Sequence, residues 1–86
     1  MNEEMRARRR ARSVLLHSIY QEASGSVTEF VSAYDLAAAQ EVDPAEAVRI
    51  VAYLEEKGYL LVDDHRAGLV RITAEGVDAV ELGRLD

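Results

Sequence analysis

The tetrapeptide Asp43-Pro44-Ala45-Glu46 constrains the fold of this chain most, because it fixes where a central helix begins. Aspartate is a favourable N-cap, proline is preferred at the first helical position, and the glutamate completes a capping box. Gly58 is a natural residue to follow a helix end, so the helix is expected to run to about Lys57. Apolar residues at helical spacing within it predict one buried face. These residues are Ala47, Ile50, Val51 and Leu54.

Shorter elements are predicted on both sides of this helix. An apolar stripe at helical spacing indicates a long first helix, and Ser32 and Thr73 are favourable caps for two more. A β-branched and aromatic run indicates a brief strand before Ser32. Two apolar runs flank a polar loop that ends in Gly68, as in a β-hairpin. The predicted elements are helix 2–23, a strand within 27–31, helix 33–40, helix 44–57, strands 59–62 and 69–72, and helix 74–82.

Charge is divided unevenly along the chain, although the whole chain carries only −6. Residues 1–12 contain five arginines and two glutamates, which gives a net charge of +3. Residues 13–86 contain five basic and fourteen acidic residues, which gives −9. Because its arginines point all around the helix, the basic segment is not expected to be buried in its own domain. We expect it to project, to fray or to meet a partner.

The length and composition exclude several classes of protein. A chain of 86 residues, 49% hydrophobic and 30% charged, is expected to form one folded domain. The absence of cysteine excludes disulfides, thiolate metal sites and cysteine nucleophiles. The two histidines have no partners at the spacing of metal ligands, so no metal site is expected. The five glycines are dispersed and form no phosphate-binding loop, so neither a bound cofactor nor catalysis is predicted. No apolar run approaches the roughly 18 residues of a membrane span, so we expect a soluble cytoplasmic protein that is not an enzyme.

The order of the elements and several short stretches point to one fold family. Residues 31–37 are similar to the first helix of a helix-turn-helix, and Val42-Asp43-Pro44 is similar to its turn. Residues 48–60 look like a recognition helix that runs into a first wing strand. Residues 72–76 are similar to the strand-to-helix junction that follows the wing. The chain thus resembles the winged helix-turn-helix domain of small bacterial and archaeal transcription regulators.

The resemblance implies a fold and a division of the chain. The implied fold is α+β and mostly α, with a three-helix core, a small antiparallel β-hairpin wing and a C-terminal helix. The winged-helix domain would occupy residues 13–83. Residues 1–12 would be a basic N-terminal extension of the first helix, which we call the basic arm, and residues 84–86 a tail.

The resemblance also implies a function, that of a DNA-binding transcriptional regulator that acts as a homodimer. The helix after Pro44 would enter the major groove, and the first helix would supply part of the dimer contact. Cationic and polar side chains on the arm, the third helix and the wing would contact phosphates and bases of double-stranded DNA. These candidate DNA-binding residues are Arg6, Arg8, Arg9, Arg10, Arg12, Arg49, Tyr53, Lys57, His65, Arg66 and Arg71.

Acidic residues on the outward face of the third helix leave a second function open. Glu46 and Glu56 repel phosphate, so this face can instead bind a protein, with Tyr53 as the anchor. The chain would then be a winged-helix protein–protein interaction module that does not read DNA. The arm has three open roles: it can contact the DNA backbone, it can be a solvated helix end held by pairs such as Glu4–Arg8, or it can dock on the acidic domain of a second copy.

Overall fold

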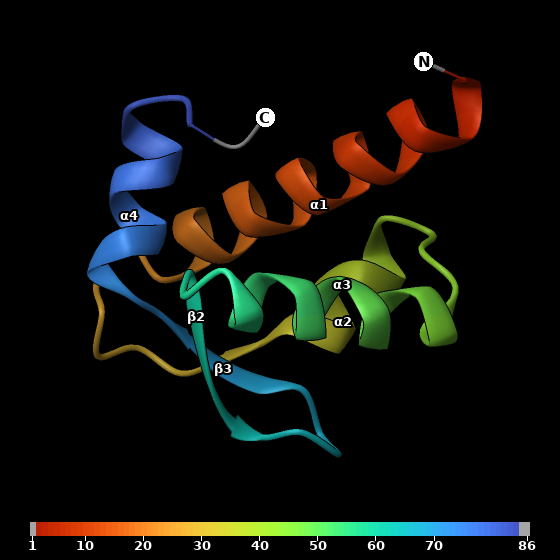
Figure 1. Ribbon diagram of the computed structural model, residues 1–86. Helices are drawn as coiled ribbons and strands as arrows, with labels where there is room; N and C mark the ends of the chain where they lie inside the picture. Colours follow the sequence, from red (N-terminus) through yellow and green to blue (C-terminus); the bar gives the residue numbers. More distant parts are fainter. Residues whose placement is uncertain (1, 85–86) are drawn as a thin grey trace.

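The computed structural model describes residues 2–84, which form four helices and a three-stranded antiparallel sheet (Figure 1). This confirms the expected α+β, mostly helical class. The tail predicted at 84–86 lies, after Arg84, outside the described residues. In chain order the elements are α1 (Glu3–Glu22), β1 (Val31–Ser32), α2 (Ala33–Ala39), α3 (Pro44–Glu56), β2 (Leu60–Asp64), β3 (Leu69–Ile72) and α4 (Ala74–Glu81).

Each helix begins at a side chain that caps it. The carboxamide of Asn2 accepts a hydrogen bond of 2.8 Å from the backbone N–H of the third residue of α1. Asp43 accepts one of 3.1 Å at the start of α3, and Thr73 accepts one of 3.0 Å at the start of α4. Ser32 caps α2 in the same way. Such bonds satisfy backbone donors that have no partner within the helix, so the predicted helix starts are confirmed.

The sheet has one strand more than the predicted hairpin. Its strand order is β1-β3-β2, with Val31 opposite Val70 and Leu60 opposite Ile72. The strand expected within 27–31 is therefore misplaced, because only its last residue belongs to β1. The position of β1 is set by pairing with β3, a contact between residues far apart in the sequence.

The strand β2 is longer than predicted, because the pairing continues through a bulge. The register with β3 shifts between Val62 and Asp64, so Asp64 is still paired, opposite Leu69. The carboxylate of Asp64 then accepts hydrogen bonds from the backbone N–H groups of Arg66 and Ala67. The predicted loop of 63–68 was therefore wrong in its first two residues, which belong to the strand.

One hydrophobic core joins the helices to the inner face of the sheet. The second half of α1 contributes Leu15, Leu16 and Ile19, none of which has exposed surface. The inward stripe predicted on α3 is buried as expected. Two parts of the chain extend away from this core, the N-terminal end of α1 and the turn between β2 and β3 (Figure 1).

Two contacts hold the hairpin turn against α2. Gly68 has φ +71° and lies directly against the ring of Tyr34, where any side chain would overlap the ring. The hydroxyl group of Tyr34 donates a hydrogen bond of 2.7 Å to the carbonyl oxygen of His65. These contacts hold the turn beside the helices.

Candidate nucleic-acid interface

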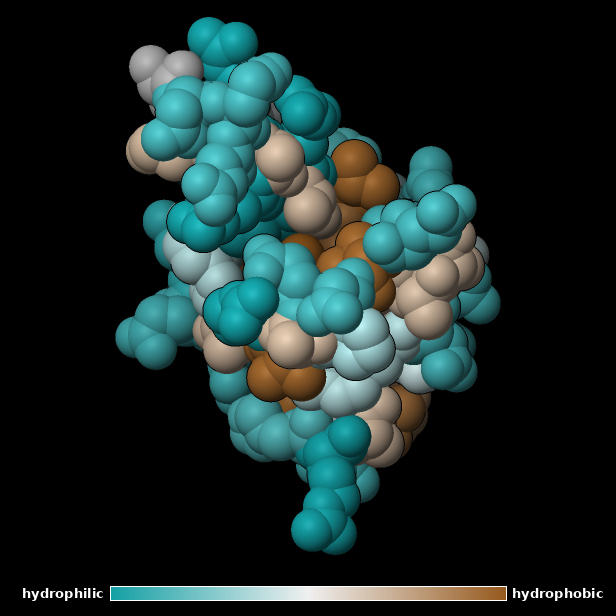
Figure 2. All heavy atoms as spheres, turned by 90° about the vertical axis from the view of Figure 1, so that its right-hand side faces the viewer, coloured by the Kyte–Doolittle hydropathy of each residue, from teal (hydrophilic) through white to brown (hydrophobic). Residues whose placement is uncertain are grey.

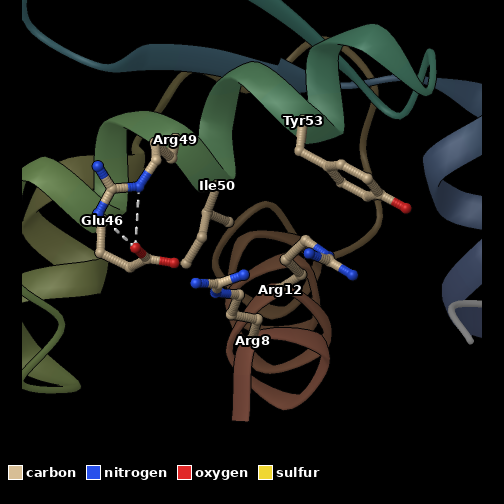
Figure 3. Close-up of a pocket in the computed structure, with 6 residues that line it drawn as sticks. All are labelled: Arg8, Arg12, Glu46, Arg49, Ile50 and Tyr53. Atoms are coloured by element: carbon tan, nitrogen blue, oxygen red, sulfur yellow. Dashed lines mark hydrogen bonds and ion pairs between the residues drawn. The ribbon is translucent and has the colours of Figure 1, made fainter. Parts of the chain in front are cut away.

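A hollow of about 320 Å³ lies between the first half of α1 and the helix α3 (Figure 3). Arg8 and Arg12 point into it from α1, and the residues that face them come from α3. Its lining consists of Arg8, Arg12, Glu46, Arg49, Ile50 and Tyr53, and we call it the α1–α3 hollow. Four of these six residues, the three arginines and Tyr53, are candidate DNA-binding residues, and Glu46 and Tyr53 belong to the alternative protein interface.

At the hollow, α1 and α3 contact each other through Arg12 and Tyr53. The guanidinium carbon of Arg12 lies 4.1 Å from the centroid of the Tyr53 ring. At this distance the cation is attracted to the face of the ring. The prediction that the basic arm is not buried in its own domain is therefore wrong at its last residue, Arg12, which packs on α3.

The other two arginines of the hollow each contact a glutamate. The Nε and Nη2 groups of Arg49 donate to Oε1 of Glu46, at 3.0 and 2.7 Å. Arg8 lies 3.5 Å from Glu4, the pair predicted from the sequence, but both side chains are more than half exposed. Exposed pairs of this kind contribute little free energy. Because the lining has three guanidinium groups and one carboxylate, it carries a net charge of +2.

The remaining arginines of the arm surround the exposed end of α1. Arg6 and Arg10 are exposed, whereas Arg9 is half-buried. Figure 2 shows hydrophilic side chains gathered over this end of the molecule, with a hydrophobic area beneath them. The arm is a regular helix from Glu3 onwards, so the backbone positions of its arginines are fixed relative to one another.

The rest of the exposed surface of α3 offers few hydrogen-bond donors. Val48 is 51% exposed, and the small residues Ala45 and Ala52 are exposed on either side of it. Lys57 and Glu56 are both exposed at the C-terminal end of the helix. Apolar side chains can contact a thymine methyl group but do not distinguish bases by hydrogen bonding.

Two of the three basic residues of the hairpin contact acidic side chains. Nε2 of His65 lies 3.1 Å from the carboxylate of Glu55, which ties the turn to α3. Arg71 donates to Asp63 at 3.2 Å and lies 5.3 Å from the centroid of the Phe30 ring. Arg66 is exposed at the tip of the turn.

Sequence reasoning missed the acidic and aromatic partners of these basic residues. Phe30 was assigned to a strand, yet it is 57% exposed and contacts Arg71. The predicted hairpin already placed Arg71 beside the strand 59–62, but the register that pairs Leu61 with Arg71 and brings Asp63 close is known only from the structure. The contact between Glu55 and His65 joins two elements and has no signature in the sequence.

Other kinds of site find little support in the part of the chain that the structure describes. Residues 2–84 contain no group of three or more histidine and acidic side chains placed to hold a metal ion. Within the same range, no helix is both long and apolar enough to cross a membrane. The hydroxyl group of Tyr20 donates to Glu81 at 2.6 Å, and this hydrogen bond raises the pKa of Tyr20 above its ordinary value of 10.0. This contact links α1 to α4, away from the α1–α3 hollow.

Comparison with models of protein families, with curated proteins and with solved structures finds no match to this chain.

Proposed function

We propose that this chain is a small winged-helix DNA-binding protein that regulates transcription as a homodimer. The order of its elements and the β1-β3-β2 sheet support a winged-helix assignment, in which α2 and α3 form the helix-turn-helix and β2–β3 the wing. The observation that carries the DNA-binding proposal is the arrangement of arginines on α1. All five lie in the first half of one continuous helix, α1, and two of them, Arg8 and Arg12, reach the hollow beside α3.

In this proposal most of the binding free energy comes from phosphate contacts. Arginines on α1 bind the DNA backbone, Arg66 contacts it from the tip of the wing, and α3 enters the major groove. The exposed part of α3 is mainly small and apolar, so discrimination between bases is modest. Residues 13–86 carry a net charge of −9, so phosphate is expected to be held mainly by the basic arm.

The homodimer is supported by an exposed apolar side chain on α1. Val14 is 48% exposed and lies beside Ala7 and Ala11. Side chains of this type are commonly buried when helices of two copies pack together. Sedimentation velocity should give the mass of a dimer for the wild type and of a monomer for Val14→Glu.

The test of DNA binding is a titration of mixed-sequence duplex DNA at several salt concentrations, followed by fluorescence anisotropy. Affinity should fall steeply with salt, and Arg10→Gln should reduce the slope of log K against log salt by about 0.9 for one lost phosphate contact. Arg84→Gln is the matched control, because it removes the same charge at the end of α4, outside the basic arm. No binding at low salt, or equal slopes for the two variants, would overturn the proposal.

A second function, the protein–protein interaction module, is favoured by one other observation. An apolar groove of about 270 Å³ lies between α2 and α3, lined by Tyr34, Ala38, Val42, Pro44, Ala47 and Val48. The predicted acidic interface is a different surface, because neither Glu46 nor Tyr53 lines this groove. Glu46 contacts Arg49, and the ring of Tyr53 lies against Arg12. Capture of a specific partner that is lost in Val48→Asp but kept in Tyr53→Ala, together with no DNA binding, would favour this function.

A further inference from the structure

We propose that the α1–α3 hollow is a binding site for the phosphate monoester group of a small molecule. Contact with DNA requires only exposed arginines along α1 and does not require a hollow. The site therefore goes beyond the proposed function, and it can be tested without DNA.

The charge of the hollow matches a dianion. Its lining carries +2, and the contact between Arg8 and Glu4 is long and exposed, so a phosphate can replace it. A phosphate monoester carries −1.5 to −2 at pH 7, because its second pKa is about 6. A phosphodiester of the DNA backbone carries only −1. The hollow is thus better matched to the monoester.

Two of the three arginines of the hollow, Arg12 and Arg49, are held in place by neighbours that leave donors for a ligand. The guanidinium carbon of Arg12 lies over the Tyr53 ring, at 4.1 Å from its centroid, and a guanidinium carries five N–H donors (Figure 3). Glu46 fixes Arg49 through two of its five N–H groups. Side chains that are already oriented lose less entropy on binding. Planar N–H groups also match the oxygen atoms of phosphate.

The size and the apolar residues of the hollow indicate more than a bare phosphate ion. A volume of about 320 Å³ lies at the lower end of the range of about 300–1,000 Å³ for small-molecule sites. Tyr53 is 41% exposed and presents apolar surface beside the arginines, whereas Ile50 is buried beneath them. A small phosphate monoester with a compact apolar or aromatic group would fill this space.

Occupation of the hollow would also affect the proposed DNA contact, and this consequence alone rests on the proposed function. A bound dianion neutralises Arg8 and Arg12 immediately beside α3. The ligand would therefore weaken DNA binding by removing positive charge from the contact surface.

The test is isothermal titration calorimetry of the full chain with phenyl phosphate, with dimethyl phosphate as the diester comparison. Phenyl phosphate should bind at least about tenfold more tightly than dimethyl phosphate. Its affinity should fall as the pH is lowered through about 6, because the monoester then loses its second charge. Equal affinity for the two compounds, or no heat of binding for phenyl phosphate, would overturn the proposal.

Two double variants on the same helix distinguish the hollow from general positive charge. Arg8→Gln/Arg12→Gln should weaken phenyl phosphate binding by about tenfold or more. Arg6→Gln/Arg10→Gln removes the same charge outside the hollow and should leave the affinity within about twofold of the wild type. Circular dichroism establishes that both variants are folded. An equal loss in the two variants would show that only diffuse charge is involved and would overturn the site.

A failure of this site and a failure of DNA binding can be told apart. The calorimetric experiment contains no DNA, and the DNA titration uses Arg10, which does not line the hollow. If the wild-type protein binds DNA as expected but does not bind phenyl phosphate, the site alone is rejected. If it binds phenyl phosphate but not DNA, the proposed function is rejected and the site remains.

Discussion

The two halves of α1 are parts of one continuous helix, yet their side chains differ in burial. In the second half, Leu15, Leu16 and Ile19 are completely buried in the core. In the first half, the arginines are mostly exposed, and the Arg12–Tyr53 and Arg8–Glu4 contacts lie at the surface. The second half of α1 therefore anchors the helix in the core, whereas the first half presents most of its arginines at the surface.

The largest expected effect is on stability, from a change in the second half. Leu16→Ala leaves a cavity in the core and should lower the free energy of unfolding by about 3 kcal/mol. Arg10→Gln, in the first half, should change it by less than about 0.5 kcal/mol. Urea denaturation of the two variants measures both values. Similar losses for the two would show that the halves do not differ as described.

A smaller effect is expected where the first half touches α3. A double-mutant cycle with Arg12→Gln and Tyr53→Leu should give a coupling free energy of about 0.5–1 kcal/mol, as for other cation–aromatic contacts. The same cycle at Arg71 and Phe30, which are 5.3 Å apart instead of 4.1 Å, should give a smaller value. A coupling of zero at Arg12 and Tyr53 would mean that the first half is not held against α3.

The smallest effect is expected at the contact between the second half of α1 and α4. The hydrogen bond to Glu81 raises the pKa of Tyr20, so the folded state holds this proton more tightly than the unfolded chain does. The stability that Tyr20 adds relative to Tyr20→Phe should therefore be fully present below pH 10.0 and be lost as the pH rises through the higher folded value. Urea denaturation of both proteins from neutral to alkaline pH measures it. A difference in stability that grows at alkaline pH would contradict this account.

Local features of the sequence predicted most of the fold but only part of the candidate site. The caps Asp43 and Thr73 and the apolar stripe of α3 are read from neighbouring residues, and the structure has them as expected. The position of β1 depends on its pairing with β3, which local patterns do not contain. The same limit applies to the site. The arginine cluster is visible in the sequence, whereas the stacking of Arg12 on Tyr53 depends on how α1 crosses α3.

The central proposal is that the first half of α1 is the half that binds the ligand. Its most direct test is a titration of the ¹⁵N-labelled protein with short duplex DNA, in which the amide chemical shifts are measured. The account predicts the largest shifts in residues 4–12, in the part of α3 that lines the α1–α3 hollow, and at Arg66. Residues of the second half of α1 and of α4 should move little. Shifts concentrated on α4 or on the outer face of the sheet, or no shifts at all at low salt, would contradict it.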